Sequence, residues 1–203
     1  MKTIEPIREL VSIMSDILYG VSLSGEFKGF NNSTQYVAEV IYQSIFTGKA
    51  EKIKLEVGLR EKLLDAPKRE KTKTLLFEPL KGQPLAPEFS VTCMSLKETL
   101  SEKLRAALTR KDLAIRDFYD IDYAVIKMNL NLNEEQFLEF VKKKLAVPGN
   151  DPLNITLARK EMLRRQLETE LKPILREKDF QQFDLDRAFN LVAEIASKLQ
   201  RLM

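Results

Sequence analysis

The chain has 203 residues, of which 33 are lysine or arginine and 30 are aspartate or glutamate, and it contains no histidine. Its 44% hydrophobic content is typical of an ordinary globular protein rather than of a disordered or fibrous one. Without an imidazole, a histidine-based catalytic triad and a histidine metal site are both excluded. The single cysteine, Cys93, excludes an intramolecular disulfide. Any catalysis must therefore rely on carboxylates, lysines, arginines, hydroxyls or a metal held by carboxylates.

Charge and hydropathy indicate a cytoplasmic protein with no membrane partner. Charged residues interrupt the segment from Lys2 to Asp16, and no stretch approaches the roughly 18 apolar residues of a membrane span. The net charge of +3 is too small to indicate nucleic-acid binding by itself. Between Lys49 and Lys73, however, nine basic residues stand against five acidic ones. This local excess is typical of a solvated loop and is compatible with a nucleic-acid partner.

The first part of the chain predicts one helix and then antiparallel strands. Apolar residues at helical spacing indicate an amphipathic helix over Glu5–Leu18. Period-two alternation predicts two strands, Tyr36–Phe46 and Glu51–Arg60, joined by a tight turn near Gly48. A proline-rich connection follows. The further strands expected within and after it are a short one at Thr74–Phe77 and a longer one at Phe89–Met94.

Helical periodicity dominates from Ser95 onward, so we divide the chain into a β-rich part, 1–94, and a helical part, 95–203. Ser95 and Glu98 have the spacing of a capping box, in which each side chain binds the other residue's backbone N–H. The helices predicted beyond this first one are Leu113–Met128, Glu134–Leu145 with Asn133 as N-cap, Ile155–Leu171 ended or kinked near Pro173, and Leu185–Leu202 with Asp184 as N-cap.

Two cations share one edge of the apolar face on the helix that begins after Ser95. At about 100° per residue, Lys103 and Arg110 fall together just outside the apolar arc. The arc consists of Leu96, Leu100, Leu104, Ala107 and Leu108. The remaining charges lie on the opposite face, where a solvated role suffices for Glu98, Glu102 and Arg105. Snorkelling of the two stems over the core would by itself explain Lys103 and Arg110.

The next predicted helix has a face of mixed charge. Its residues Arg116, Asp117, Asp120 and Lys127 fall within one sector of the helical projection. Arg116 and Asp120 are spaced for an i,i+4 ion pair, which on an exposed helix is a complete structural explanation. Charge geometry alone therefore does not decide between a binding role and a structural one.

The two helices together carry adjacent motifs that resemble those of a known family. The matching residues are Lys103, Leu104, Ala106 and Arg110 for a Lys-Leu-x-Ala-x-x-x-Arg motif, and Arg116, Asp117 and Asp120 for Arg-Asp-x-x-Asp. Both look like motifs of the AbiEii/AbiGii family of abortive-infection toxins, which have a nucleotidyltransferase fold. Upstream, Lys52–Val57 is similar to the family's apolar-acid-apolar strand, in which Glu56 is the acid.

This resemblance implies an α+β protein in which a partial nucleotidyltransferase-like mixed sheet precedes a helical C-terminal half. It implies a toxin of a toxin–antitoxin system for phage defence, whose partner is a cognate antitoxin. It also implies transfer of a nucleotidyl group from a nucleoside triphosphate to a nucleic-acid acceptor, with transfer RNA as one candidate. Two Mg²⁺ ions would bridge the phosphates in such a reaction.

By the same resemblance, each motif residue has an expected role. Lys103 would bind the triphosphate, with Arg110 or Arg116 in support. Asp117 and Asp120 would orient these cations or act near the acceptor. Glu56 would be the third, metal-facing carboxylate. An ion pair with a lysine on the same strand face is an equally good explanation of Glu56.

One motif of the family is not found in this sequence. Upstream of the third carboxylate there should be a Gly-Gly or Gly-Ser turn and then an Asp-x-Asp strand, and neither precedes Glu56. Mg²⁺ requires several oxygen ligands in octahedral geometry, which Glu56 alone does not supply. We therefore expect either that the true start lies upstream or that the chain is an inactive member of the family.

Two alternatives stand beside this interpretation, and we reject the first of them. The string Asp120-Ile121-Asp122 would place two aspartates on one face if it were a strand. We favour a helix there, because no glycine turn precedes the string and Arg116 and Asp117 already fit the helical motif. In a different class of function, the chain would be a non-catalytic helical interaction module, or a homodimeric adaptor that covers its exposed sheet edge with a second copy.

Overall fold

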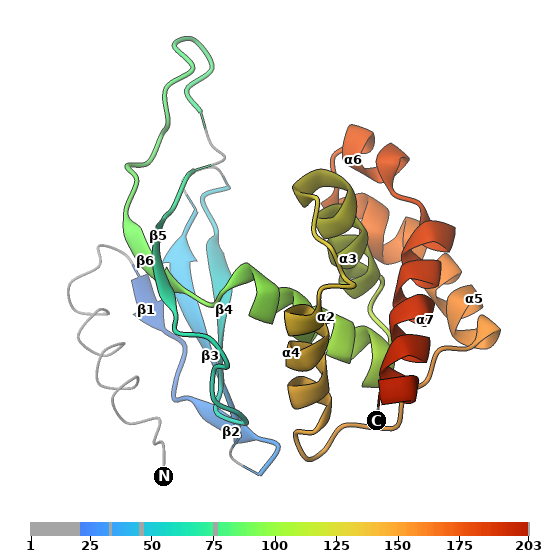
Figure 1. The fold of residues 1–203 in the computed structure, drawn as a ribbon. Helices are drawn as coiled ribbons and strands as arrows, with labels where there is room; N and C mark the ends of the chain where they lie inside the picture. The colour runs from blue at the N-terminus through green and yellow to red at the C-terminus, as the bar shows by residue number, and fades with distance from the viewer. Residues whose placement is uncertain (1–20, 33, 45–46, 75–76, 203) are drawn as a thin grey trace. The chain divides into compact units, whose positions relative to one another are not determined.

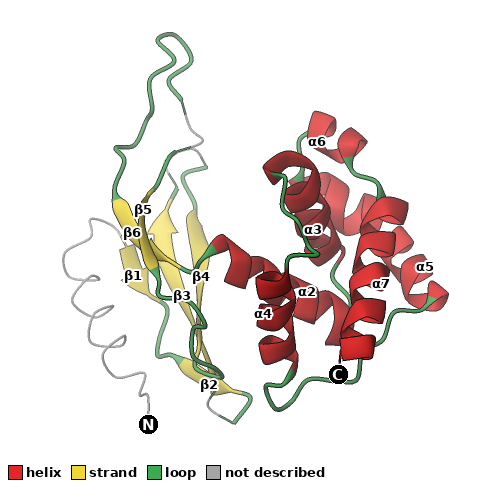
Figure 2. Ribbon diagram, viewed as in Figure 1, coloured by secondary structure: helices red, strands yellow, loops and turns green. Residues whose placement is uncertain are grey.

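The computed structural model describes residues 21–32, 34–44, 47–74 and 77–202 (Figure 1). The chain forms two compact units that divide between Lys62 and Leu63. The first unit contains a four-stranded sheet, and the second contains a β-hairpin followed by helices (Figure 2). The predicted α+β class is therefore confirmed. The helix predicted over Glu5–Leu18 lies outside the described residues, and the division predicted at residue 94 stays a prediction.

The sheet of the first unit is built around β3 (Gln35–Gln43). Strand β4 (Ala50–Gly58) pairs with one edge of β3 along its whole length, and β2 (Lys28–Phe30) and β1 (Val21–Leu23) share the other edge. All of these pairs are antiparallel, as predicted for the two long strands. Gly48 has a φ of +65°, a left-handed conformation that glycine adopts without strain, and this permits the tight turn between β3 and β4.

A hairpin of two short strands, β5 (Lys68–Lys71) and β6 (Ser90–Cys93), begins the second unit. Strand β6 confirms the prediction at Phe89–Met94. Strand β5 was not predicted, because its four residues are all charged and exposed and give no hydrophobic alternation. Of the short strand predicted at Thr74–Phe77, residues 75 and 76 lie outside the described residues, and Phe77 forms an isolated bridge with Pro84.

The helices of the second unit enclose one hydrophobic core. They are α2 (Leu96–Thr109), α3 (Ile115–Met128), α4 (Glu135–Leu145), α5 (Leu157–Gln166), α6 (Glu177–Gln182) and α7 (Leu185–Leu202). Helix α2 packs against α3, α4 and α7, and Phe118 of α3 stacks on Phe189 of α7 with ring centroids 6.2 Å apart. None of the described helices combines the length and the apolar character that crossing a bilayer demands.

The helix ends differ from the prediction at two places. Helix α4 has Glu134 at its N-cap position and no side-chain cap, so the cap predicted at Asn133 is wrong. Helix α5 ends at Gln166, and the predicted continuation to Leu171 is a π-helical turn followed by a 3₁₀ turn that contains Pro173. At α7 the prediction holds. There the carboxylate of Asp184 accepts a hydrogen bond from the backbone N–H of Arg187 at 2.9 Å.

An ion pair between α2 and α4 is fully buried. Lys144 Nζ lies 2.6 Å from Glu98 Oε1, and the two side chains are 1% and 0% exposed. The same carboxylate accepts hydrogen bonds from the backbone N–H groups of Leu64 and Asp65. The solvated role predicted for Glu98 is therefore wrong. Only half of the capping box forms, because Ser95 Oγ accepts from the Glu98 N–H while the Glu98 carboxylate binds other partners.

We expect acid to destabilise the protein partly through Glu98. Burial alone would raise the pKa of this carboxyl, but hydrogen bonds from Lys144 and from the N–H groups of Asp65 and Leu64 hold the pKa below its ordinary value of 4.5. A carboxyl with a depressed pKa stabilises the fold above its unfolded-state pKa, and this contribution is lost as the pH falls through the folded-state pKa. The free energy of unfolding of Glu98→Gln, measured by urea unfolding, should therefore decrease less between about pH 6 and about pH 3 than that of the wild type.

A matched control for this measurement is Glu194→Gln on α7. Glu194 is exposed and pairs with Lys198 one helical turn away. Because an exposed pair of this kind contributes little to stability, the control should keep the pH dependence of the wild type. If Glu98→Gln also keeps that dependence, the carboxyl of Glu98 does not titrate with folding and the argument fails.

Candidate functional site

Four of the residues predicted to act together meet between α2 and α3. Lys103 Nζ lies 3.2 Å from Asp117 Oδ1 and 2.9 Å from Asp120 Oδ2. Arg110 Nη1 lies 3.1 Å from Asp117 Oδ2. Asp117 therefore bridges the two cations, one with each of its carboxylate oxygens. We call these four residues, Lys103, Arg110, Asp117 and Asp120, the charge cluster.

The local sequence explains why the charge cluster forms. Lys103 is on α2 and Arg110, seven residues later, is the C-cap residue of this helix, so about two helical turns separate them along the same side. Asp117 is in the first turn of α3, which a short connection joins to α2. Gln166 of α5 fixes this connection: its side chain accepts from the N–H of Ile115 at 2.8 Å and donates to the carbonyl of residue 113 at 2.9 Å.

The charge cluster is buried on one side and open to solvent on the other. The side chain of Asp117 is only 5% exposed, whereas Lys103 and Arg110 are 35% and 49% exposed. Partial burial alone would lower the pKa of Lys103, but the hydrogen bond to Asp120 and the charge of Asp117 more than offset it, so the pKa is raised above 10.5. Lys103 is therefore a permanent cation and is not suited to act as a general base near neutral pH.

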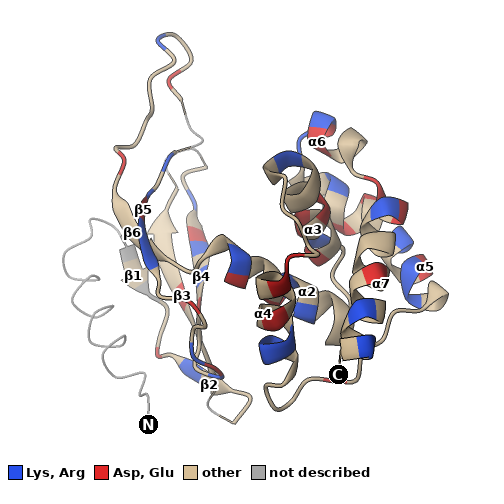
Figure 3. Ribbon diagram, viewed as in Figure 1, with Lys and Arg blue, Asp and Glu red and all other residues tan. Residues whose placement is uncertain are grey.

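This arrangement suits the binding of an anion with several oxygen atoms. A buried carboxylate holds two solvent-accessible cations at fixed positions, and each cation keeps further N–H donors for a ligand. Acidic and basic residues are interspersed along α2 and α3, so the cations are not part of a broad basic face (Figure 3). The selectivity of the charge cluster would accordingly come from the positions of Lys103 and Arg110.

Arg116 is not tied to the charge cluster by an ion pair among the described residues. It is exposed on α3. The i,i+4 pair that its spacing with Asp120 permits does not form, because Asp120 contacts Lys103 instead. The nucleotide-binding role expected of Arg116 stays a prediction.

Glu56 lies on β4, in the other compact unit. It is exposed, it faces the same side of the sheet as Lys54, and the two form an ion pair. The ion pair with a lysine of the same strand is therefore present, while the metal-facing role of Glu56 stays a prediction. Nearby on this face, Lys52 Nζ lies 2.6 Å from Glu39 Oε2, so lysines and glutamates neutralise one another along the strand.

The charge cluster does not fit a Mg²⁺ ion. Both oxygens of Asp117 are engaged by cations, and the remaining carboxylate, that of Asp120, contacts Lys103. Mg²⁺ needs several free oxygen ligands at about 2.1 Å, and Lys103 would repel it. Across the described ranges there is also no group of three acidic, cysteine or histidine residues that could hold a metal. The charge cluster therefore leaves too few free carboxylate oxygens to hold a divalent cation.

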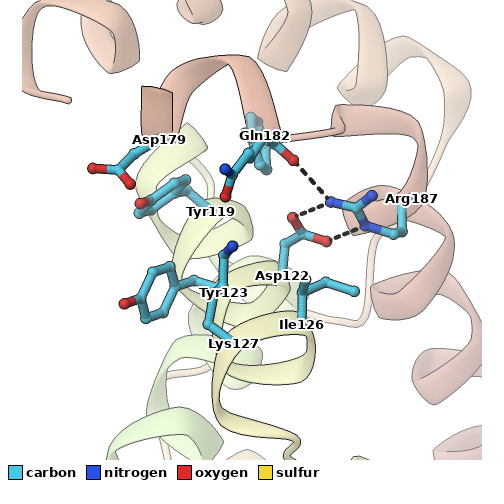
Figure 4. A pocket seen from close by; sticks show the side chains of 9 residues that line it. Tyr119, Asp122, Tyr123, Ile126, Lys127, Asp179, Gln182 and Arg187 are labelled. Carbon is cyan, nitrogen blue, oxygen red and sulfur yellow. Dashed lines mark hydrogen bonds and ion pairs between the residues drawn. The ribbon is translucent and has the colours of Figure 1, made fainter. Parts of the chain in front are cut away.

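The two aspartates of the Asp120-Ile121-Asp122 string point to different partners. Both lie on α3, so the strand alternative is wrong. Asp120 contacts Lys103, whereas Asp122 forms a bidentate pair with Arg187 of α7, with distances of 2.7 and 2.8 Å (Figure 4). Side chains of α3, including Tyr119 and Tyr123, line a small pocket around this pair. The pair joins α3 to α7 and explains Asp122 structurally.

The chain is similar to known proteins over most of its length. Residues 9–194 match the family described as "Nucleotidyl transferase AbiEii toxin, Type IV TA system". The chain thus belongs to the AbiEii family of nucleotidyltransferase toxins, as its motifs predicted. A type IV toxin–antitoxin system pairs such a toxin with an antitoxin, and nucleotidyltransferases generally use a divalent metal.

Two solved structures from Helicobacter pylori resemble this chain. One, assigned as a nucleotidyltransferase, is 16% identical with a TM-score of 0.46, and the match covers 96% of this chain and 75% of that one. The other, JHP933, is 14% identical with a TM-score of 0.46, and the match covers 95% of this chain and 70% of that one. No curated protein sequence matches the chain.

Proposed function

We propose that this protein transfers a nucleotidyl group from a nucleoside triphosphate to a nucleic-acid acceptor, and that the charge cluster binds the triphosphate. The observation that carries the proposal is the convergence of Lys103 and Arg110 on the two oxygens of buried Asp117. In the reaction the acceptor's hydroxyl oxygen bonds to the α-phosphorus, the bond between that phosphorus and the α,β-bridging oxygen breaks, and pyrophosphate leaves.

Lys103 and Arg110 would act by balancing the charge of the phosphates. Cations held in place before the ligand arrives stabilise developing negative charge without the cost of reorganisation. Asp117 supplies this fixed orientation, since it contacts both cations and is itself 5% exposed. Asp120 has 40% of its side chain exposed. Lys103 could therefore leave Asp120 to bind a phosphate, or Asp120 could act near the acceptor.

The partners that follow from this proposal are a nucleoside triphosphate and an RNA, with transfer RNA as one candidate. Glu56 stays the proposed metal-facing carboxylate and Arg116 a proposed supporting cation. Within the basic stretch between Lys49 and Lys73, the side chains of Lys52, Lys54 and Lys71 pair with glutamates. A homodimer without transfer activity is the competing proposal, and size-exclusion chromatography with light scattering would detect it.

The position of the radiolabel tests the proposed reaction. The purified chain is incubated with total RNA, MgCl₂ and each of the four ribonucleoside triphosphates, labelled once at the α-phosphate and once at the γ-phosphate. Nucleotidyl transfer should place the α-label on RNA and leave the γ-label in pyrophosphate. Label from the γ-position on RNA would instead indicate a kinase. If the α-label of none of the four nucleotides appears on RNA, the proposal is wrong.

A further inference from the structure

Arg159 of α5 is a buried cation with unused hydrogen-bonding capacity. Only 8% of the surface of this residue is exposed. One guanidinium nitrogen, Nη2, donates to the backbone carbonyl of Arg110 at 2.7 Å. Its Nε–H is buried and has no hydrogen-bond partner. Within the described ranges no carboxylate forms an ion pair with Arg159, which distinguishes it from the buried Lys144, whose charge is balanced by Glu98.

A buried charge of this kind is costly unless something balances it. Burial lowers the pKa of the Arg159 guanidinium, and no acidic group offsets that effect. The carbonyl of Arg110, at the C-terminal end of α2, supplies only the partial negative charge of a helix end. A structural role in capping α2 therefore accounts for the hydrogen bond of Nη2 but leaves the positive charge of Arg159 without a counter-charge.

Arg159 lines a surface depression of about 410 Å³. The other lining residues are Thr109, Arg110, Lys111, Asp151, Pro152, Leu153 and Asn154. Three cations thus face a single carboxylate, that of Asp151. Arg110 and Lys111 are exposed, whereas Arg159 is buried. Two exposed cations and one buried, unbalanced cation that line the same depression have the chemistry to bind an anion.

We propose that this depression binds a phosphate group of the acceptor nucleic acid. Arg110 and Lys111 contact the phosphate, and Arg159 supplies the underlying positive charge. The assignment to the acceptor rests on the proposed function. Lys103 does not line the depression, so a triphosphate held by Lys103 leaves the depression free for a second phosphate. Arg110 belongs to both the charge cluster and the depression, and it therefore places the two phosphate sites next to each other.

Binding of RNA in the absence of nucleotide and Mg²⁺ tests this proposal separately from catalysis. The probe is a fluorescein-labelled single-stranded RNA, titrated with the full chain at several salt concentrations and followed by fluorescence anisotropy. Lys111→Gln should weaken binding roughly threefold to tenfold. It should also reduce the slope of log K against log salt by about 0.7, the value for one phosphate contact on a single strand. Asp151→Asn should strengthen binding, since it removes the carboxylate that repels the phosphate.

The opposite signs of these two changes exclude a simple loss of folding. Both residues are exposed, so both variants remain informative even if Arg159→Gln, which should also weaken binding, fails to fold. The matched control is Lys178→Gln, an exposed lysine on α6 that does not line the depression; it should leave RNA affinity unchanged.

Three results would overturn the assignment. If the wild type does not bind the RNA at low salt, the depression is not an acceptor site. If Lys111→Gln and Asp151→Asn change the affinity for a nucleoside triphosphate but not for RNA, the phosphate comes from the nucleotide. If neither affinity changes, Arg159 serves only to hold the carbonyl of Arg110. None of these results depends on whether the protein transfers nucleotides, so the α-label experiment remains an independent test.

Discussion

Replacing Lys103 by methionine is expected to reduce nucleotide transfer by about 100-fold or more, the usual loss when a fixed electrostatic partner of the transition state is removed. Methionine keeps the length and apolar character of the stem but removes the charge. Asp117 keeps its contact with Arg110 at 3.1 Å, so the substitution does not leave a buried carboxylate without a cation. The fold should therefore persist. The measurement is kcat/KM for transfer of α-labelled nucleotide to RNA, with the far-ultraviolet circular dichroism spectrum as a check of folding.

Lys160→Met provides the matched control for Lys103→Met. Lys160 is also a partly buried helical lysine in an ion pair, but it lies on α5 and its partner at 2.9 Å is Asp186 of α7, which is not a member of the charge cluster. Its replacement should leave the transfer rate close to that of the wild type. Lys103→Arg keeps the charge and should retain part of the activity. Transfer by Lys103→Met at the wild-type rate would remove Lys103 from the proposed site.

The charge cluster was predictable in part, because helical spacing reports which side chains share a face. The seven-residue interval predicted that Lys103 and Arg110 lie on one side, and in the structure both contact Asp117. The motif also located Asp117 and Asp120 on the next helix. Spacing within one helix does not report competition between helices, and so it did not show that Asp120 contacts Lys103 rather than Arg116.

Arg159 shows a second limit of sequence interpretation. The sequence predicted the helix that contains this residue, but no motif, spacing or charge run singled the residue out. Its significance depends on three facts of tertiary structure: burial, a contact with a carbonyl 49 residues earlier in the chain, and a nitrogen without a partner. None of these leaves a periodic signal. A buried arginine without a carboxylate is recognisable only when the surrounding chain is folded.

Glu98 was assigned to the wrong environment for a related reason. The projection of α2 places Glu98 opposite the main apolar arc, on the side of a helix that usually faces solvent. Helix α4 instead packs against α2 and brings Lys144 to this position from 46 residues away. Backbone N–H groups of Leu64 and Asp65 complete the set of donors. A glutamate on the polar side of an amphipathic pattern is therefore buried when a second layer covers that side.

The buried pair gives the second large expected effect, which concerns stability. Lys144→Met should destabilise the protein by about 3 to 5 kcal/mol, because it leaves the Glu98 carboxylate buried without its cation. Lys144 also lies 3.1 Å from Glu102, but Glu102 keeps Arg105 as a cation at 2.9 Å, so Glu98 is the carboxylate that loses its cation. Urea unfolding followed by circular dichroism at a helical wavelength measures the effect, since α2 and α4 both belong to the helical unit.

Two further variants separate lost charge balance from lost packing. Lys143→Met changes the neighbouring, exposed lysine of α4 and should alter the free energy of unfolding by less than about 0.5 kcal/mol. The double variant Glu98→Gln with Lys144→Met removes both charges and keeps one amide oxygen, which can accept from Leu64 or from Asp65, because these two N–H groups bind different oxygens of the Glu98 carboxylate. It should therefore recover a large part of the stability lost in Lys144→Met, because replacing a whole buried pair costs far less than removing one member. A single variant as stable as the wild type, or a double variant no more stable than the single one, would show that charge balance at Glu98 does not hold α2 against α4.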